Sequence, residues 1–66
     1  MYNFKVNDMT CGHCALSVDK AVKAVDPGAQ VRIDLKAHHV EIQSDKPASV
    51  FATAITDAGY TAIPQP

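Results

Sequence analysis

The sequence predicts an α+β domain with a ferredoxin-like βαββαβ sandwich, in which a four-stranded antiparallel sheet carries two helices on one face. Apolar residues recur with period two in four short stretches and with helical spacing in two longer ones. Their order is strand, helix, strand, strand, helix, strand. Each strand–helix–strand half is expected to cross over right-handed. The two halves then interleave as a split βαβ unit. The 66 residues leave room for one domain, so we expect residues 1–66 to form it.

The first strand and helix are predicted within the first 25 residues. Tyr2, Phe4 and Val6 alternate with polar residues, which is the period of a strand with one buried face. Residues 8–13 break the alternation and predict a loop. A helix is predicted next, because apolar residues then recur along one face: Cys14, Val18, Ala21, Val22 and Val25. Residues 26–28, Asp-Pro-Gly, end that helix, since proline cannot continue it and glycine suits the turn.

The second half contains the other two central strands, a helix and a last strand. Alternation over residues 30–35 and 39–43 predicts two strands joined by a turn at 36–38. Residues 44–47, Ser-Asp-Lys-Pro, are a helix-start signal. The stripe of the second helix consists of Phe51, Ala54, Ile55 and Ala58. Gly59 is predicted in a left-handed C-terminal cap, and residues 60–63 in a short strand before Pro64. The sheet face away from the helices is predicted to meet water; it carries Asn3, Lys5, Arg32, Asp34 and Glu41.

Composition excludes several classes of function. The net charge of −1 gives no nucleic-acid footprint, and no apolar run is long enough to cross a membrane. The N-terminus lacks the basic start and apolar stretch of a secretory signal, so we expect a cytoplasmic protein. No paired carboxylates, nucleophile–base pair or phosphate loop is present, so we expect a carrier and not an enzyme.

The hexapeptide Met9-Thr10-Cys11-Gly12-His13-Cys14 is the candidate metal site. It joins the first strand to the first helix, whose unpaired N–H groups and partial positive charge favour thiolate over thiol. Asp8 is the only carboxylate nearby, and no second Cys-x-x-Cys is present. Two thiolates without two further ligands suit Cu(I) better than structural Zn²⁺, which takes four.

A lone Cys-x-x-Cys has other interpretations: a redox pair, half of a zinc site, or an incidental pair. A zinc site needs two more ligands, and His38 and His39 could provide them only near the loop. We expect their hairpin at the opposite end of the sheet. A thioredoxin-type thiol–disulfide oxidoreductase also places this motif at a helix N-terminus, but needs a larger domain.

The hexapeptide resembles the MxCxxC loop of the heavy-metal-associated (HMA) domain family, and especially of its free-standing bacterial copper chaperones. The resemblance extends along essentially the whole chain. Val18 and Val22 resemble core positions of the first helix, residues 31–35 (VRIDL) the second strand, and residues 54–60 (AITDAGY) a second helix that ends in Gly-Tyr.

This resemblance implies one Cu(I) per monomer, held near-linearly by Cys11 and Cys14. It also implies delivery, by ligand exchange, to the Cys-x-x-Cys of the metal-binding domain of a copper-transporting P-type ATPase. A copper-bridged dimer and other cargo, Hg(II), Zn(II) or Cd(II), remain open. Two features depart from the family pattern: Asp8 replaces a common glycine, and His38 and His39 occupy a turn without a ligand role.

Five residues are expected to support the site. Met9 is expected in the core under the loop in preference to a ligand role. Thr10 is expected to cap the first helix or to hydrogen-bond within the loop, and the resemblance associates threonine here with copper. Gly12 gives the loop freedom or lets a partner's sulfur approach. His13 could tune the charge of the thiolates or act as a third ligand, and as an exposed loop histidine it is expected to do neither in the monomer. Tyr60 either hydrogen-bonds the metal site or covers the core edge.

One face of the first helix is a candidate partner surface. Leu16 is an exposed apolar residue beside the metal loop, and Lys20 and Lys23 lie on the same face. An ordinary solvated helix face is the competing interpretation for the two lysines.

Overall fold

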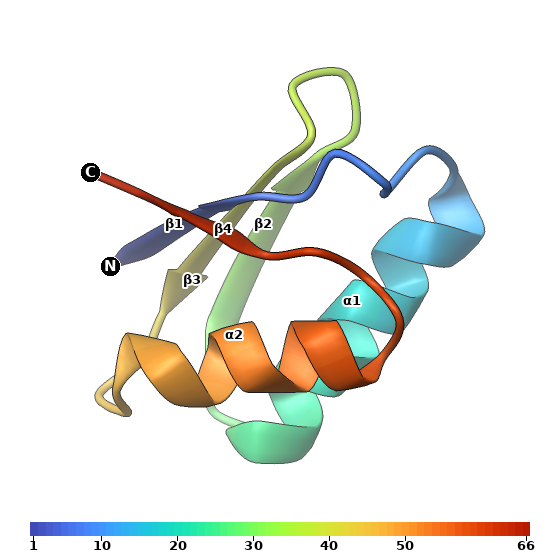
Figure 1. Ribbon diagram of the computed structural model, residues 1–66. Helices are drawn as coiled ribbons and strands as arrows, with labels where there is room; N and C mark the ends of the chain where they lie inside the picture. The colour runs from blue at the N-terminus through green and yellow to red at the C-terminus, as the bar shows by residue number, and fades with distance from the viewer.

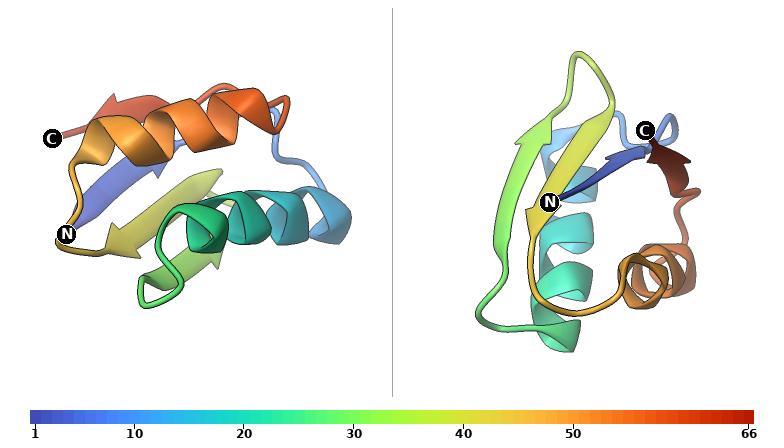
Figure 2. Two further views of the ribbon diagram at one scale, coloured as in Figure 1. Left: turned by 90° about the horizontal axis from the view of Figure 1, so that it is seen from below. Right: turned by 90° about the vertical axis from the view of Figure 1, so that its left-hand side faces the viewer.

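The structure, a computed structural model, describes residues 1–66 as a two-layer sandwich of one sheet and two helices (Figure 1). The elements follow the predicted order: β1 (Tyr2–Lys5), α1 (Gly12–Val25), β2 (Gln30–Asp34), β3 (His39–Gln43), α2 (Ala48–Asp57) and β4 (Ile63–Gln65). Both helices lie against the same face of the sheet (Figure 2). The predicted ferredoxin-like α+β fold is confirmed. No helix is long and apolar enough to span a membrane.

The sheet has the strand order β2-β3-β1-β4, with every neighbouring pair antiparallel. Since β1 and β2 are each antiparallel to β3, they run in the same direction and end at the same edge. The β2–β3 hairpin therefore lies beside the β1–α1 loop, and Val6 N donates to His38 O at 2.7 Å. The prediction that this hairpin lies at the opposite end of the sheet was wrong.

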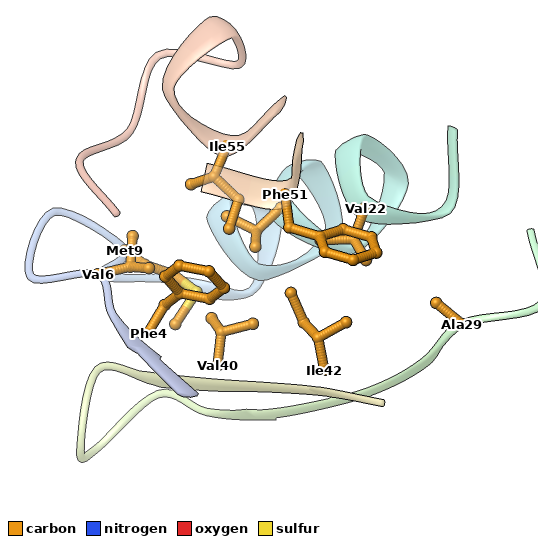
Figure 3. Packing of buried hydrophobic residues seen from close by; sticks show 10 residues of the cluster. Phe4, Val6, Met9, Val22, Ala29, Val40, Ile42, Phe51 and Ile55 are labelled. Carbon is orange, nitrogen blue, oxygen red and sulfur yellow. The ribbon is translucent and has the colours of Figure 1, made fainter. Parts of the chain in front are cut away.

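The core fills the space between the sheet and the helices (Figure 3). Strand positions with period two and helix positions with period near four converge there, as the apolar pattern predicts. Nine side chains are at most 1% exposed: Phe4, Val6, Met9, Val18, Val22, Val40, Ile42, Phe51 and Ile55. Burying an aliphatic or aromatic side chain of this size stabilises the fold by about 1.5–3 kcal/mol.

The ends of α1 and α2 differ in detail from the prediction. α1 begins at Gly12, with Cys11 as its N-cap residue and no side-chain cap, so the expected cap by Thr10 is absent. His13 lies in the first turn of α1 and not in the preceding loop. Pro47 is the N-cap residue of α2, while the Ser44 hydroxyl donates to the Asp26 carboxylate at 2.5 Å.

The C-terminus of α2 forms the predicted left-handed cap. Gly59 has φ of 98°, a value that glycine adopts without the steric cost of a Cβ. Gly59 N donates to Thr56 O at 3.0 Å and Tyr60 N donates to Ile55 O at 3.2 Å, the paired bonds of a Schellman motif. This cap turns the chain from α2 back toward the sheet.

The last strand lies later than predicted. β4 runs from Ile63 to Gln65 and includes Pro64, whereas residues 60–63 were expected. Proline is tolerated because β4 is an edge strand, where a missing N–H breaks no second ladder. Residues 60–62 are consequently free of the sheet and run along the end that carries the metal loop.

Candidate metal site

A tight turn leads from β1 into the cysteine loop. Met9 N donates to Val6 O at 3.1 Å, which closes the turn over residues 6–9. The Met9 side chain is fully buried and packs with the core below the loop (Figure 3), which favours its predicted core role. Met9 is buried in the core, whereas Cys11, two residues later, is exposed at the surface.

The two sulfur atoms lie close together at the N-terminus of α1. Cys11 Sγ is 3.3 Å from Cys14 Sγ, with Cys11 exposed and Cys14 half-buried. Cys11 is the N-cap residue and Cys14 lies in the first helical turn, so the helix geometry itself brings the pair together. Both are free thiols, and the pair is open to solvent through Cys11.

The environment of Cys14 favours its thiolate. A hydrogen bond from Tyr60 is the largest cause that lowers the Cys14 pKa from 9.0 to about 6, followed by the Thr10 backbone and the Cys11 side chain. Desolvation opposes this shift. The bond to Cys14 also raises the pKa of Tyr60, so its phenol stays protonated as a donor. At pH 7 the site therefore holds a thiolate at Cys14, the protonation state that binds soft metals.

The Schellman motif of α2 places Tyr60 at the site. Gly59 reverses the chain and brings Tyr60 near Cys14, whose pKa it lowers. Ser17, one turn further along α1, donates its hydroxyl to His13 O at 3.1 Å and lowers the pKa of Tyr60. Both roles considered for Tyr60 stay predictions: its ring packs partly buried against the core, and its hydroxyl lowers the pKa of Cys14.

The other residues predicted at the site, Thr10, Gly12 and His13, lie around the two sulfur atoms. A Cβ built on Gly12 meets nothing within 4 Å and Gly12 has no positive φ, so the space beside the sulfurs is open and no backbone strain requires glycine. Thr10 and His13 are exposed. No group of three or more His, Cys, Asp or Glu residues is arranged to hold a metal ion.

Two contacts at the loop were missed from the sequence. His38 has φ of 53°, and its Nδ1 lies 3.1 Å from Met9 O. The Asp8 carboxylate accepts from Thr61 N at 3.1 and 3.2 Å. Following the strand directions would have placed the hairpin, and hence His38, at this end. Asp8 was noted only as a nearby carboxylate in place of a common glycine, because a contact across 53 residues leaves no local pattern.

The spacing of the sulfurs limits how a metal ion fits. With metal–sulfur bonds of about 2.3 Å, a separation of 3.3 Å corresponds to a bent arrangement with an angle of about 90°. A linear ion needs the sulfurs about 4.6 Å apart. Cys11 is exposed and lies outside the buried core, so rotating its side chain to change this separation moves no core residue.

Fold and site together define a class of protein: a small α+β domain that presents two closely spaced thiols at an exposed helix N-terminus, as small metal-binding domains do. The model of the heavy-metal-associated domain matches residues 3–61. The chain belongs to this family, and it resembles free-standing copper chaperones.

Individual relatives agree with this assignment. The chain is 37% identical to the COP-associated protein of Helicobacter felis over 57 residues, which cover 83% of this chain and 86% of that protein. It is 35% identical to Copper-transporting ATPase 2 of Rhizobium meliloti over 60 residues, which cover 88% of this chain but 7% of that protein. A similar domain thus occurs both nearly alone and as a small part of a larger transporter.

Solved structures extend the similarity to the whole fold. A gold binding protein superposes with a TM-score of 0.94 at 32% identity, covering 98% of this chain and 100% of that one. The copper chaperone Atx1 of Synechocystis PCC6803, in a trimeric form, superposes with a TM-score of 0.91 at 35% identity, covering 94% and 98%.

Proposed function

We propose that the chain is a metallochaperone that binds one Cu(I) through Cys11 and Cys14, and that it is a carrier and not an enzyme. The observation that supports this most directly is the 3.3 Å separation of two free sulfurs, one of them exposed. The lowered pKa of Cys14 favours its thiolate near neutral pH, so Cu(I) displaces fewer protons when it binds and competes less with protons for the sulfur. The similarity to a copper chaperone supports copper as the cargo.

Transfer requires a site that a second protein can reach. Cys11 is exposed and the position of Gly12 is open, so an incoming thiolate can approach the ion beside Cys11. With two protein ligands, the ion has a vacant coordination position, and a third sulfur can bind before the first one leaves. Leu16, 58% exposed in the first half of α1, offers an apolar contact next to the sulfurs.

The proposed recipient is the metal-binding domain of a copper-transporting P-type ATPase. The similarity of this chain to part of such an ATPase supports the match, since two related domains can present their sulfurs to one ion in the same way. Free thiols and a thiolate at Cys14 require a reducing compartment, and we propose the cytoplasm.

The test is a Cu(I) competition titration against a chromophoric chelator. We expect one tightly bound Cu(I) per chain in the reduced protein. Cys11→Ser and Cys14→Ser each abolish tight binding, while circular dichroism shows an unchanged fold because neither side chain is fully buried. Stoichiometric binding by the double serine variant would show that other residues hold the metal. Parallel titrations with Hg(II), Zn(II) and Cd(II) rank the alternative cargo.

Thiol–disulfide exchange is the second candidate, because a lowered pKa at Cys14 beside a thiol 3.3 Å away also suits a redox pair. Insulin reduction measures it. The carrier proposal predicts no rate above that of free dithiol, whereas catalytic insulin reduction without tight Cu(I) binding would favour the redox function.

A further inference from the structure

His38, in the turn of the β2–β3 hairpin, is hydrogen-bonded to both ends of the turn at residues 6–9. Its carbonyl oxygen accepts from Val6 N at 2.7 Å, and its ring Nδ1 lies 3.1 Å from Met9 O. Because a carbonyl oxygen only accepts, Nδ1 is the donor in the second contact. The hairpin therefore holds one end of this turn through the backbone of His38 and the other end through its side chain.

The backbone conformation of His38 shows that its side chain does more than complete a turn. Its φ of 53° lies in the left-handed region, which is uncommon for residues other than glycine. Glycine reaches this φ without steric cost and would serve the turn better. What histidine adds, and glycine lacks, is the hydrogen bond of a half-buried ring to Met9 O.

The bond to Met9 O controls the peptide group that leads to Cys11. Burial of the Met9 side chain fixes its position in the core but not the rotation of the following peptide about ψ. This planar group contains both Met9 O and Thr10 N, so fixing the oxygen sets the direction in which the chain leaves Met9. Beyond it, Cys11 is fixed by α1, where Ala15 N donates to Cys11 O at 3.1 Å. Exposed Thr10 is then the only residue between the two anchors.

We propose that His38 is a positioning residue of the metal site: by donating its Nδ1–H to Met9 O, it orders the backbone of Cys11 before the ion binds. His38 hydrogen-bonds neither sulfur, so it acts through the peptide group that follows Met9. A backbone that is ordered in advance loses less conformational freedom on binding. The proposal deepens the proposed function, and only its effect on Cu(I) affinity rests on that function.

Two substitutions separate the side-chain bond of His38 from its backbone conformation. Asparagine tolerates a positive φ and carries its amide nitrogen on Cγ, as histidine carries Nδ1, so His38→Asn keeps the donor. His38→Gly accepts the same φ but has no donor. His39→Gln is the matched control, since it replaces the neighbouring imidazole, on a residue of β3 that pairs with Lys5 of β1.

Backbone order parameters from NMR relaxation, in the reduced, metal-free protein, measure the order of the cysteine loop. We expect values of about 0.85 for the Thr10 and Cys11 amides in the wild type, His38→Asn and His39→Gln, and values below about 0.6 in His38→Gly. The Val6 amide should stay protected from hydrogen exchange in every variant, because it binds the backbone of His38. A loop as rigid in His38→Gly as in the wild type, or as mobile in His38→Asn as in His38→Gly, would overturn the proposal.

The tautomer of the His38 ring tests the same contact in the unaltered chain. NMR of the ring nitrogens shows which of them carries the proton in the neutral imidazole. We expect the proton on Nδ1, where it can be donated to Met9 O. A ring protonated on Nε2 alone, whose Nδ1 only accepts, would overturn the proposal without any substitution.

A Cu(I) competition titration links the order of the loop to metal binding. From the net contribution of one hydrogen bond, we expect a roughly two- to tenfold lower affinity in His38→Gly, and wild-type affinity in His38→Asn and His39→Gln. An unchanged affinity in His38→Gly would overturn the role of His38 in metal binding. If the wild type binds no Cu(I), the proposed function fails, while the order parameters and the tautomer still decide whether His38 holds the loop.

Discussion

Replacing Tyr60 by phenylalanine removes the strongest influence on Cys14 while keeping the ring. The hydrogen bond from Tyr60 is the largest of four contributions that together lower the Cys14 pKa from 9.0 to about 6, against an opposing desolvation. The four contributions together exceed the net lowering of about three units, so the largest exceeds about three quarters of a unit, and losing it raises the pKa to about 7. At pH 6 the thiolate fraction then falls from about one half to about one tenth.

Thiolate absorbance near 240 nm, followed from pH 4 to pH 9 in the reduced, metal-free protein, measures this change. We expect the first titration step near pH 6 in the wild type and about one unit higher in Tyr60→Phe. Tyr2→Phe is the matched control, because its hydroxyl bonds Lys46 O at the far end of the sheet. A Tyr60→Phe midpoint equal to that of the wild type would refute the assignment of the shift to this hydrogen bond.

The same shift gives stability a definite pH dependence. The folded pKa of Cys14 lies below 9.0, so its contribution to stability is fully present above about pH 9 and is lost as the pH falls through about 6. The Tm of the metal-free wild type should therefore rise between these values. In Tyr60→Phe the rise should begin at a higher pH and be smaller.

Three further predictions concern the scaffold. Met9→Leu conserves volume in the core, so it should cost less than about 1.5 kcal/mol of unfolding free energy and keep the Cu(I) affinity. Met9→Ala should cost about 2–5 kcal/mol. A loss of Cu(I) affinity in Met9→Leu would instead make the thioether a ligand. Gly59→Ala places a Cβ on a residue with φ of 98° and should lower the unfolding free energy by about 1–2 kcal/mol in chemical denaturation. In Gly12→Ala the added Cβ meets nothing within 4 Å, so this control should not destabilise the fold. Equal costs in the two variants would disprove the strain argument. Ser44→Ala removes the hydrogen bond that most lowers the Asp26 pKa, so the Tm should fall at pH 7. The difference in Tm from the wild type should shrink as the pH drops below 3.8. A Tm difference independent of pH would assign the effect to packing.

The order of elements, most of the core and the cysteine loop could be predicted from the sequence, because each depends on local periodicity. Val18 and Val22, or Val40 and Ile42, need only their own helix or strand to define a buried face. The cap at Gly59 was predictable for the same reason, since a helix end is a local event.

Apart from the exact start of α1, the features that the sequence analysis missed depend on contacts between distant segments. Ser44 was expected to help start α2, but Asp26, 18 residues earlier, binds its hydroxyl. The contact of His38 with Met9 follows from the parallel directions of β1 and β2, which the prediction of the hairpin's position did not take into account. β4 begins three residues later than predicted, and Thr61, which precedes it, donates its N–H to Asp8, 53 residues away.

X-ray absorption at the copper edge, on the protein loaded with one equivalent of Cu(I), tests most directly whether the cysteine pair holds the ion. Binding by Cys11 and Cys14 predicts two sulfur neighbours at about 2.2–2.3 Å and none in the double serine variant. A first shell made of nitrogen or oxygen atoms, or a sulfur shell that survives both substitutions, would contradict it.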